Sequence, residues 1–340
     1  MKILIATDAW HPQINGVVRS LQQMSTELTK MGIEVRFITP QMYKTVPLPS
    51  YPEIRLSLVS QKSIAKHIAD FAPDHIHIAT EGPIGFQTRS VCVKTSYVFT
   101  TSYHTRFPEY ISARFPIPEW LSYACLRRFH NAGRGVMVAT KTMRDELEAK
   151  GFKNIMSWSR GVDSALYHPQ DRETMDIPEL AGLQRPFFLY VGRVSVEKNL
   201  DAFLSLDLPG TKIIVGDGPS KHTLEKQYPQ AKFLGVKQGQ QLAQTYALSD
   251  VFVFPSLTDT FGIVLLEALA CGTPVAAFPV TGPIDALEGA DIGVLNADLK
   301  IAALSALSKP RAKCREFALT KSWRKSAEQF LKNVKTAQEL

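Results

Sequence analysis

Short apolar runs alternate with longer amphipathic stretches along most of the chain. The first example is an apolar run over residues 3–7, a helical pattern over residues 17–28 and a second apolar run over residues 35–39. A short apolar run predicts a buried strand, and apolar side chains three to four positions apart predict a helix with one buried face. Strand, helix and strand in this order predict two parallel strands joined by a crossover helix.

The same alternation continues and falls into two series. In the first series, further strands are expected over residues 54–58, 75–79, 97–101 and 136–139. After a proline-rich polar stretch, the second series is expected over residues 187–192, 213–215, 232–234, 251–254 and 275–278. Because one hydrophobic core rarely serves more than about 250–300 residues, the 340 residues predict two doubly wound α/β domains. We place them at residues 1–165 and 166–308, followed by a helical segment, residues 309–340.

Composition excludes several classes of protein. The chain has no run of about 18 apolar residues that would predict a membrane-spanning helix, and its opening residues resemble a strand, not a secretory leader. We therefore expect a cytoplasmic protein. The four cysteines have no close spacing, so we expect reduced thiols. The dinucleotide motif G-x-G-x-x-G is absent, which disfavours a nicotinamide-dependent dehydrogenase, and no Asp-x-Asp motif suggests a metal site.

Charge is unevenly distributed along the chain. Residues 1–165 contain 20 Lys and Arg against 13 Asp and Glu, residues 166–308 contain 10 against 16, and residues 309–340 contain 9 against 3. A basic first half and a basic tail suit an anionic membrane surface or a nucleic acid, and an ordinary solvated surface would give the same totals. Charge alone leaves these three possibilities open.

Residues 255–274 combine a strand end, a glycine and two carboxylates. Gly262 allows the backbone to approach a ligand closely, and the apolar pattern after it predicts a helix. Unpaired N–H groups at a helix start favour a phosphate at Phe261 to Ile263, and Glu267, more than one turn further on, would reach a ribose hydroxyl. Alternatively, Asp259 and Glu267 only cap and solvate a buried helix.

Two glycine-containing loops follow the first strands of the second series. Arg193 and Lys198 lie five residues apart in the first of these loops, where two cations would meet one diphosphate. An ordinary surface loop is the alternative. Gly216 and Asp217 lie in the next loop, which either borders a nucleotide or is a plain turn.

The first domain offers two further candidates. Gly16 and Val17 lie between the first strand and the following helix, where their backbone would meet a diphosphate, although a single glycine is a weak signal. The segment 102–106 ends a predicted strand and would present His104 and Arg106 to a cleft between the domains. A histidine at a strand end is more often structural.

These motifs occur in an order that resembles the family 4 glycosyltransferases, which have the GT-B fold. The resemblance extends over nearly the full chain and rests on Gly16, His104, Arg193, Lys198, residues 215–219, Asp259 and Glu267. Residues 7–18 and 102–105 are most similar to the subgroup that contains bacterial α-mannosyltransferases and plant sulfolipid synthases. The resemblance implies two Rossmann-like domains that face a cleft, with the C-terminal helices returning to the first domain.

Two positions depart from the pattern of the family. Residues 160–163 match a further signature, in which asparagine is commoner than Arg160, so a donor contact by this residue stays open. The first acid of the family is usually glutamate, and Asp259 is shorter by one methylene. The sugar hydroxyl that Asp259 contacts would therefore lie deeper or be reached differently.

The resemblance implies retaining transfer from a nucleoside-diphosphate sugar, with no metal ion or other cofactor and no enzymic nucleophile. The transition state would resemble an oxocarbenium ion attacked from its front face. Arg193 and Lys198 would hold the diphosphate, Glu267 the ribose, and His104 and Asp259 the donor sugar. The segment Leu234 to Val236 would contact the base, and the backbone at Gly16 and at Phe261, Gly262 and Ile263 would contact the phosphates. Further donor contacts are implied for Val17, Gly216, Asp217 and Thr260.

The acceptor is inferred from residues 107–134, where six aromatic residues interleave with four arginines. This combination suits a bilayer interface, and the alternative is that the aromatic residues fill the core while the arginines are exposed. With the basic tail, it favours an enzyme bound to the inner face of the cytoplasmic membrane that glycosylates a lipid such as diacylglycerol or a glycolipid. A soluble or polysaccharide acceptor is the alternative.

Two functions of other classes fit parts of the pattern. A sugar-nucleotide epimerase can share the two-domain fold and would release a free epimer without an acceptor. A basic binding module for nucleic acid would show steep salt dependence. Asp259 and Glu267 would repel a phosphate backbone, so we expect no nucleic acid partner. UDP-hexose and GDP-mannose both remain possible donors.

Overall fold

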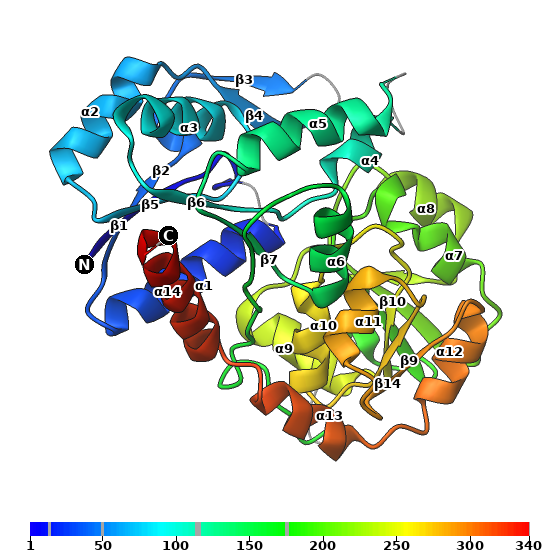
Figure 1. Cartoon of the computed structure of the whole chain (residues 1–340). Helices are drawn as coiled ribbons and strands as arrows, with labels where there is room; N and C mark the ends of the chain where they lie inside the picture. Colours follow the sequence, from blue (N-terminus) through cyan, green and yellow to red (C-terminus); the bar gives the residue numbers. More distant parts are fainter. Residues whose placement is uncertain (13–14, 49–50, 113–116, 174–176, 340) are drawn as a thin grey trace. The chain divides into compact units, whose positions relative to one another are not determined.

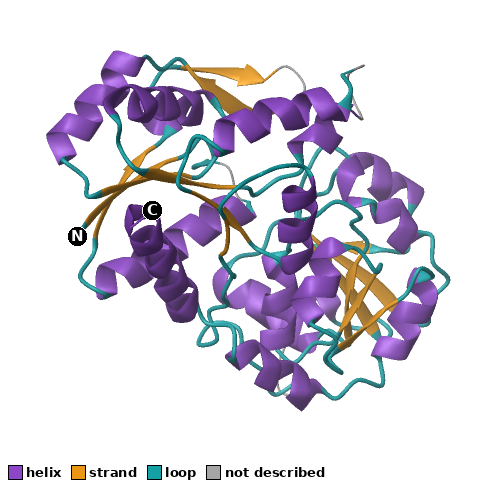
Figure 2. Cartoon of the chain, viewed as in Figure 1, coloured by secondary structure: helices purple, strands orange, loops and turns teal. Residues whose placement is uncertain are grey.

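The computed structural model describes residues 1–12, 15–48, 51–112, 117–173 and 177–339 (Figure 1). The chain divides into two compact units, of which the first comprises residues 1–160 and 323–340 and the second residues 161–322. Each unit contains a six-stranded parallel sheet flanked by helices (Figure 2). The predicted α/β fold with two Rossmann-like domains is confirmed.

The unit boundaries differ from those placed by sequence. The first crossing lies after residue 160 instead of residue 165, and the second after residue 322 instead of residue 308. Helix α13 (Arg311–Leu319) belongs to the second unit because Cys314 and Ala318 are buried in its core, against α10 (Ile263–Ala270). Only α14 (Trp323–Glu339) returns to the first unit.

The sheet of the first unit has the strand order β2–β1–β5–β6–β7–β8, and all neighbouring strands are parallel. Its strands are β1 (Lys2–Ala6), β2 (Glu34–Ile38), β5 (His75–Ile78), β6 (Phe99–Ser102), β7 (Gly135–Val138) and β8 (Ile155–Ser157). Its helices, besides α14, are α1 (Gly16–Lys30), α2 (Gln61–Phe71), α3 (Pro83–Thr95), α4 (Phe107–Ser112), α5 (Glu119–His130) and α6 (Lys141–Ala149).

Strand β1 shows why this sheet is covered on both faces. Ile3 and Ile5 pack in the cluster with α1 and α14, whereas Leu4 and Ala6 pack in the cluster with α2 and α3. Because successive side chains of a strand point to opposite faces, a strand covered on both faces is apolar throughout. Figure 1 shows α1 and α14 on one side of the sheet and α2 and α3 on the other.

Four strands depart from the sequence prediction, which did not include β3 (Thr45–Leu48), β8 or β14 (Gly293–Leu295) and placed β4 (Tyr51–Ser57) in the parallel sheet. The run at residues 54–58 forms most of β4, but β4 pairs antiparallel with β3 in a hairpin outside the parallel sheet. Strands β8 and β14 have three residues each, too few for a strand pattern to stand out.

The sheet of the second unit has the order β11–β10–β9–β12–β13–β14, again all parallel. Its strands besides β14 are β9 (Phe187–Val191), β10 (Thr211–Val215), β11 (Lys232–Phe233), β12 (Val251–Phe254) and β13 (Val275–Ala277). Its helices besides α10 and α13 are α7 (Leu200–Leu204), α8 (Lys221–Gln227), α9 (Gly239–Leu248), α11 (Thr281–Leu287) and α12 (Leu299–Ala306). Side chains of β9 alternate between a cluster with α9 and α10 and a cluster with α7 and α12.

Helix α14 completes the core of the first unit. Ala327, Phe330 and Val334 are fully buried in the same cluster as β1 and α1. The indole N–H of Trp158 donates to the hydroxyl of Ser326 at 3.1 Å, so the helix is also hydrogen-bonded to the end of the first segment of this unit. The helical segment expected over residues 309–340 forms two helices, α13 and α14, which are interrupted where the chain crosses from one unit to the other.

Candidate functional site

The strand order of the second unit determines where its ligand-binding loops gather. The order reverses between β9 and β12, because β10 and β11 follow on one side and β13 and β14 on the other. In open α/β sheets, ligands bind beyond the carboxyl ends of the strands at such a reversal. The two loops that leave there, 192–199 and 255–262, contain Arg193, Lys198 and Asp259.

Lys198 and Asp259 form an ion pair between these two loops. The Nζ of Lys198 lies 2.6 Å from Oδ1 of Asp259, and the two side chains are 21% and 20% exposed. The side-chain amide of Asn199 also donates to the carbonyl of Pro255 at 3.1 Å, which joins the loops a second time. The structure therefore brings together the cation and the acid that the sequence assigned to one donor molecule.

A buried tyrosine fixes the start of the first loop. The hydroxyl of Tyr190 donates to the carbonyl oxygen of Arg193 at 2.9 Å. Burial, followed by the charges of Asp259 and Glu197, raises the pKa of Tyr190 well above its ordinary value, so the hydroxyl keeps its proton. This hydrogen bond from the end of strand β9 thus fixes the backbone of Arg193.

Three buried side-chain oxygens in these loops have no hydrogen-bond partner among the described residues. They are Oδ2 of Asp259, Oγ of Ser195 and Oγ of Ser256. Buried polar atoms in folded proteins are nearly always paired, so unpaired ones concentrated in two adjoining loops indicate a ligand or water site. Sequence reasoning named Asp259 and missed both serines, whose only signal was their position shortly after strand ends.

The loop after β9 and the loop after β10 are bonded backbone to backbone. The N–H of Val194 donates to the carbonyl of Asp217 at 2.9 Å, and the N–H of Gly192 donates to the carbonyl of Val215 at 3.0 Å. A Cβ atom on Gly216 would lie 1.8 Å from the carbonyl oxygen of Gly192, so only glycine fits there. Gly216 is thus required for the packing of the loops, whereas the exposed Asp217 can still border a ligand.

The two predicted phosphate sites at helix starts differ in their capping. Helix α10 begins after Gly262, which has φ +81°, and no side chain caps it. At the start of α1, by contrast, Oδ1 of Asn15 accepts from the N–H groups of Val17 and Val18, each at 3.0 Å. A phosphate at Gly16 and Val17 would have to displace this cap, so the start of α10 is the better anion site.

Glu267 lies deeper than its predicted role suggests. Its side chain is almost fully buried in α10, and Oε2 accepts from the hydroxyl of Tyr246 in α9 at 3.0 Å. Tyr246 therefore orients the carboxylate. The predicted contact with a ribose hydroxyl stays a prediction.

The segment predicted to contact the base lies at the carboxyl end of β11. The N–H of Leu234 donates to the carbonyl of Ile214 at 2.9 Å, and Leu234 packs against the core. The side chain of Val236 is 52% exposed and offers apolar surface at the same edge of the sheet as the two donor loops. Thr260 and Phe261 in the loop after β12 are partly buried.

In the first unit, His104 follows β6 and contacts Arg160. The Nη2 of Arg160 lies 3.0 Å from Nδ1 of His104. Burial, followed by the charges of Arg160, His77 and His130, holds the pKa of His104 well below its ordinary value. His104 is therefore neutral at physiological pH. The sequence left the role of Arg160 open, and in the structure this side chain bonds His104.

The guanidinium of Arg106 is bound by acidic side chains of the first unit. It makes two hydrogen bonds to the carboxylate of Glu146, at 2.7 and 2.9 Å, and one to Glu109 at 3.1 Å. These acids join α6 and α4 to the loop after β6. The sequence pattern predicted that Arg106 faces a cleft between the domains. In the structure its guanidinium instead joins two helices of the first unit through ion pairs.

Asp8 lies at the strand-order reversal of the first sheet, as the donor loops lie at the strand-order reversal of the second sheet. The strand order reverses between β1 and β5, and Asp8 follows β1. Its carboxylate accepts from the backbone N–H groups of Ile84 and Gly85 at 2.8 and 3.1 Å, at the start of α3. Burial raises the pKa of Asp8. The chain thus fills this helix start with its own anion, which sequence reasoning missed.

Known protein families match the chain in two consecutive segments. The family described as Glycosyltransferase Family 4 matches residues 14–166, and the one described as Glycosyl transferases group 1 matches residues 171–330. The chain belongs to the family 4 glycosyltransferases. The predicted family and the predicted enzyme class are confirmed.

Three curated relatives of this glycosyltransferase differ in the sugars that their names specify. The sulfoquinovosyl transferase of Arabidopsis thaliana is 34% identical over 279 residues, which is 76% of this chain and 54% of the plant protein. A GDP-mannose-dependent α-mannosyltransferase of Mycobacterium tuberculosis is 29% identical, with 87% and 83% of the two chains covered. The α-monoglucosyldiacylglycerol synthase of Streptococcus pneumoniae is 25% identical, with 82% and 71% covered. The glycosyltransferase thus spans about half the length of the first relative.

Among solved structures, the sucrose-phosphate synthase of Thermosynechococcus elongatus has a similar fold. The TM-score is 0.77 at 19% sequence identity, with 97% of each chain covered. At this identity the likeness concerns the fold alone, which is that of a GT-B glycosyltransferase.

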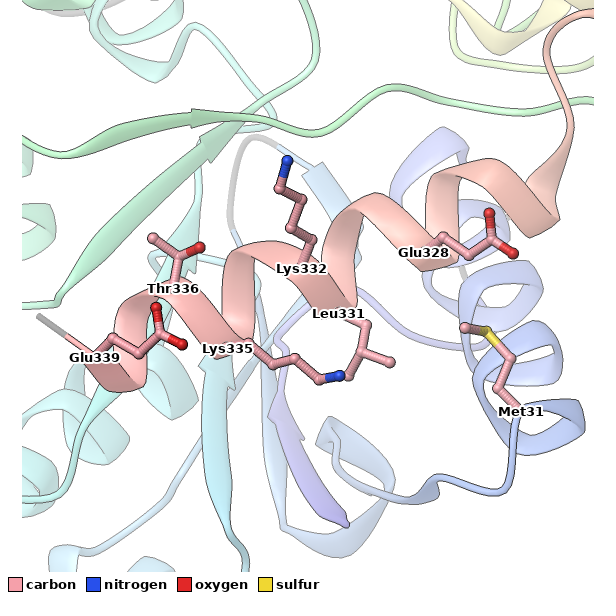
Figure 3. Close-up of a pocket in the computed structure, with 7 residues that line it drawn as sticks. All are labelled: Met31, Glu328, Leu331, Lys332, Lys335, Thr336 and Glu339. Atoms are coloured by element: carbon pink, nitrogen blue, oxygen red, sulfur yellow. The ribbon is translucent and has the colours of Figure 1, made fainter.

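None of the predicted site residues lines the pocket of about 350 Å³ that the first unit contains. It is formed by Met31, at the end of α1, and by side chains of α14 (Figure 3). Within the described ranges, no group of three or more His, Cys, Asp or Glu side chains could hold a metal ion, and no helix is long and apolar enough to cross a membrane.

Proposed function

We propose that this glycosyltransferase is a retaining hexosyltransferase that moves a hexose from a nucleoside-diphosphate sugar to a membrane lipid. The observation that carries the proposal is the Lys198–Asp259 pair at the strand-order reversal, with one oxygen of Asp259 unpaired. The names of two relatives specify mannose and glucose, which supports a hexose. Both UDP-hexose and GDP-mannose are candidate donors.

The donor loops would act on the leaving diphosphate. As the bond between the anomeric carbon and the diphosphate oxygen breaks, negative charge grows on the diphosphate. Arg193, Lys198 and the uncapped start of α10 would stabilise that charge. These groups supply positive charge without a metal ion, so we propose that none is required.

The sugar would be held while its bonds change. Oδ2 of Asp259 would accept a hydrogen bond from a sugar hydroxyl. The acceptor hydroxyl would attack the anomeric carbon on the face that the diphosphate leaves, and its proton would pass to the departing diphosphate oxygen. The new bond then lies on the same face as the old one, which gives retention without an enzymic nucleophile.

The aromatic side chains that the structure describes in the segment 107–134 fall into two groups, whereas those of Tyr110 and Phe115 lie outside the described part. Tyr123 and Phe129 are buried in the core of the first unit, as the structural alternative requires. Phe107 and Trp120 are 39% and 69% exposed, and Leu121, which follows Trp120 in the first turn of α5, is 50% exposed. Arginines on the same helix, Arg127 and Arg128, are exposed as well.

We propose that the first turn of α5, with Trp120, inserts into an anionic bilayer on the inner face of the cytoplasmic membrane, and that Arg127 and Arg128 contact the lipid headgroups. An exposed tryptophan followed by cationic side chains on one helix suits the interface between lipid tails and headgroups. A lipid acceptor is consistent with the relative whose name contains diacylglycerol.

Trp120→Ala is expected to weaken binding to anionic phospholipid vesicles roughly tenfold, because the indole supplies much of the apolar area that the bilayer would bury. Sedimentation with vesicles of phosphatidylglycerol and phosphatidylcholine measures the effect. Leu319→Ala, at a 50% exposed leucine of the second unit, is the matched control and should bind as wild type. Equal binding by both variants would refute a role for α5.

The experiment that tests the proposed function has two steps. First, UDP, GDP and their hexose derivatives are compared by thermal shift, because a ligand that binds only the folded state raises the melting temperature. The stabilising donor is then incubated with diacylglycerol vesicles or with soluble sugars, with and without EDTA. We expect a glycolipid whose anomeric configuration equals that of the donor, at a rate that EDTA does not change. A free epimer without acceptor, or no stabilisation by any sugar nucleotide, would refute the proposal.

A further inference from the structure

Arg160 is a buried arginine that forms no hydrogen bond to an acid within the described part of the chain. Its side chain is 5% exposed. Among the described residues, it donates to Nδ1 of His104 and to the carbonyl oxygens of Trp158 and Ser159. The guanidinium also lies 4.1 Å from the ring centroid of Trp158. A buried cation without a carboxylate is costly, so a role beyond packing is expected.

The chemistry of the guanidinium determines the state of His104. An arginine side chain carries only N–H donors and has no acceptor. The contact of 3.0 Å between Nη2 and Nδ1 is therefore a hydrogen bond only if Nδ1 of His104 has a free lone pair. A neutral imidazole with an unprotonated Nδ1 carries its hydrogen on Nε2.

Burial and the neighbouring cationic or titratable groups both disfavour protonation of His104. A proton on Nδ1 would break the bond to Arg160 and bring two cations together inside the protein. His77 and His130 also oppose a positive charge on His104, and Nε2 of His130 lies 3.0 Å from Oε1 of Glu81. Burial also lowers the pKa of Arg160 to about 9, which still leaves it charged at neutral pH.

We propose that Arg160 is a positioning residue that holds His104 in the neutral Nε2–H tautomer, so that His104 donates a hydrogen bond to the sugar and does not act as a base. This inference rests on the proposed function for its substrate, and it deepens that function. With the lone pair of Nδ1 engaged, the acceptor proton has no route to His104. It passes to the diphosphate oxygen instead, as front-face transfer requires.

The state of His104 is tested directly by ¹⁵N NMR of the full chain labelled at histidine. The signals of His104 are identified by their loss in a His104→Gln variant. We expect an unprotonated Nδ1 and a protonated Nε2 throughout the range from about pH 5 to pH 8. A hydrogen on Nδ1, or an imidazolium at neutral pH, would overturn the proposal whether or not the protein transfers sugar.

Variants of Arg160 test the consequence for catalysis. Arg160→Met removes the donor, so His104 should exchange between tautomers and titrate. We expect kcat to fall roughly tenfold and to acquire an acidic limb in its pH profile, with a smaller change in the KM for the donor. Arg160→Lys keeps a donor and a charge and should restore much of the rate and the Nε2–H tautomer.

The controls separate this inference from the proposed function and from loss of folding. Arg144→Gln, at an exposed arginine of α6, should change neither the spectrum nor the rate. A folded Arg160→Met variant with the wild-type tautomer and pH profile would overturn the role of Arg160. If Arg160→Met does not fold, the wild-type spectrum and the Arg160→Lys variant decide the same question. If the wild type transfers no sugar, the proposed function fails while the spectrum still decides the tautomer.

Discussion

Lys198→Ala is expected to lower kcat for sugar transfer roughly a thousandfold, because the growing charge on the leaving diphosphate loses a cation that faces it. The fold should survive. The ion pair with Asp259 is about one-fifth exposed, so its loss should cost about 1–3 kcal/mol, and the hydrogen bond from Asn199 to Pro255 still joins the two loops. Donor turnover and urea unfolding, measured on the same preparation, separate the two effects.

Lys309→Ala is the matched control for this variant. Lys309 makes an ion pair of similar length with Asp291, at 2.5 Å, and its side chain is 26% exposed. It lies beyond α12 and outside the loops 192–199 and 255–262. We expect wild-type turnover. Equal rates for Lys198→Ala and Lys309→Ala would remove the diphosphate role of Lys198.

Gly216→Ala is expected to reduce the free energy of unfolding by at least about 3 kcal/mol, the largest stability effect that we predict for one methyl group. The new Cβ would lie 1.8 Å from the carbonyl oxygen and 2.9 Å from the carbonyl carbon of Gly192, so a backbone segment has to move. That segment leads into Arg193, and donor affinity should fall together with stability. Chemical denaturation and the donor-induced thermal shift measure the two losses.

Gly32→Ala distinguishes this clash from backbone strain. Gly32 also has a positive φ, +79°, but a Cβ atom there would meet no atom within 4 Å. Its substitution should cost only about 1 kcal/mol. If Gly216→Ala unfolds no more easily than Gly32→Ala, the close contact between the two loops is not a source of stability.

Local sequence pattern was sufficient for most of the fold. Strands such as β9 and β12 are buried on both faces, so they are continuously apolar and stand out in the sequence. The hairpin of β3 and β4 was misassigned because an apolar run does not specify its partner. The break between α13 and α14 was missed because the helical pattern of the sequence continues across it. The helix breaks there because α13 packs in the second unit and α14 in the first.

The candidate site was predictable where its chemistry lies within one loop. Arg193 and Lys198 share a loop, and Asp259 precedes a glycine at a helix start, so their spacing suggested a diphosphate site. The resemblance to the family favoured this interpretation over an ordinary surface loop and a simple helix cap. Arg160 and His104 are 56 positions apart, and their hydrogen bond depends on how β6 and the segment after β8 lie in the folded sheet. No local pattern reports such a contact.

The return of α14 to the first unit has a consequence for the order in which the chain folds during synthesis. The second unit is continuous from residue 161 to residue 322, so all of it is synthesised before α14. The apolar face of β1 and α1 stays uncovered until Ala327, Phe330 and Val334 emerge. Although domains usually fold in the order of synthesis, we expect this protein to complete its second unit first and its amino-terminal unit last. Limited proteolysis of a released chain truncated after residue 322 would then cut the first unit and spare the second.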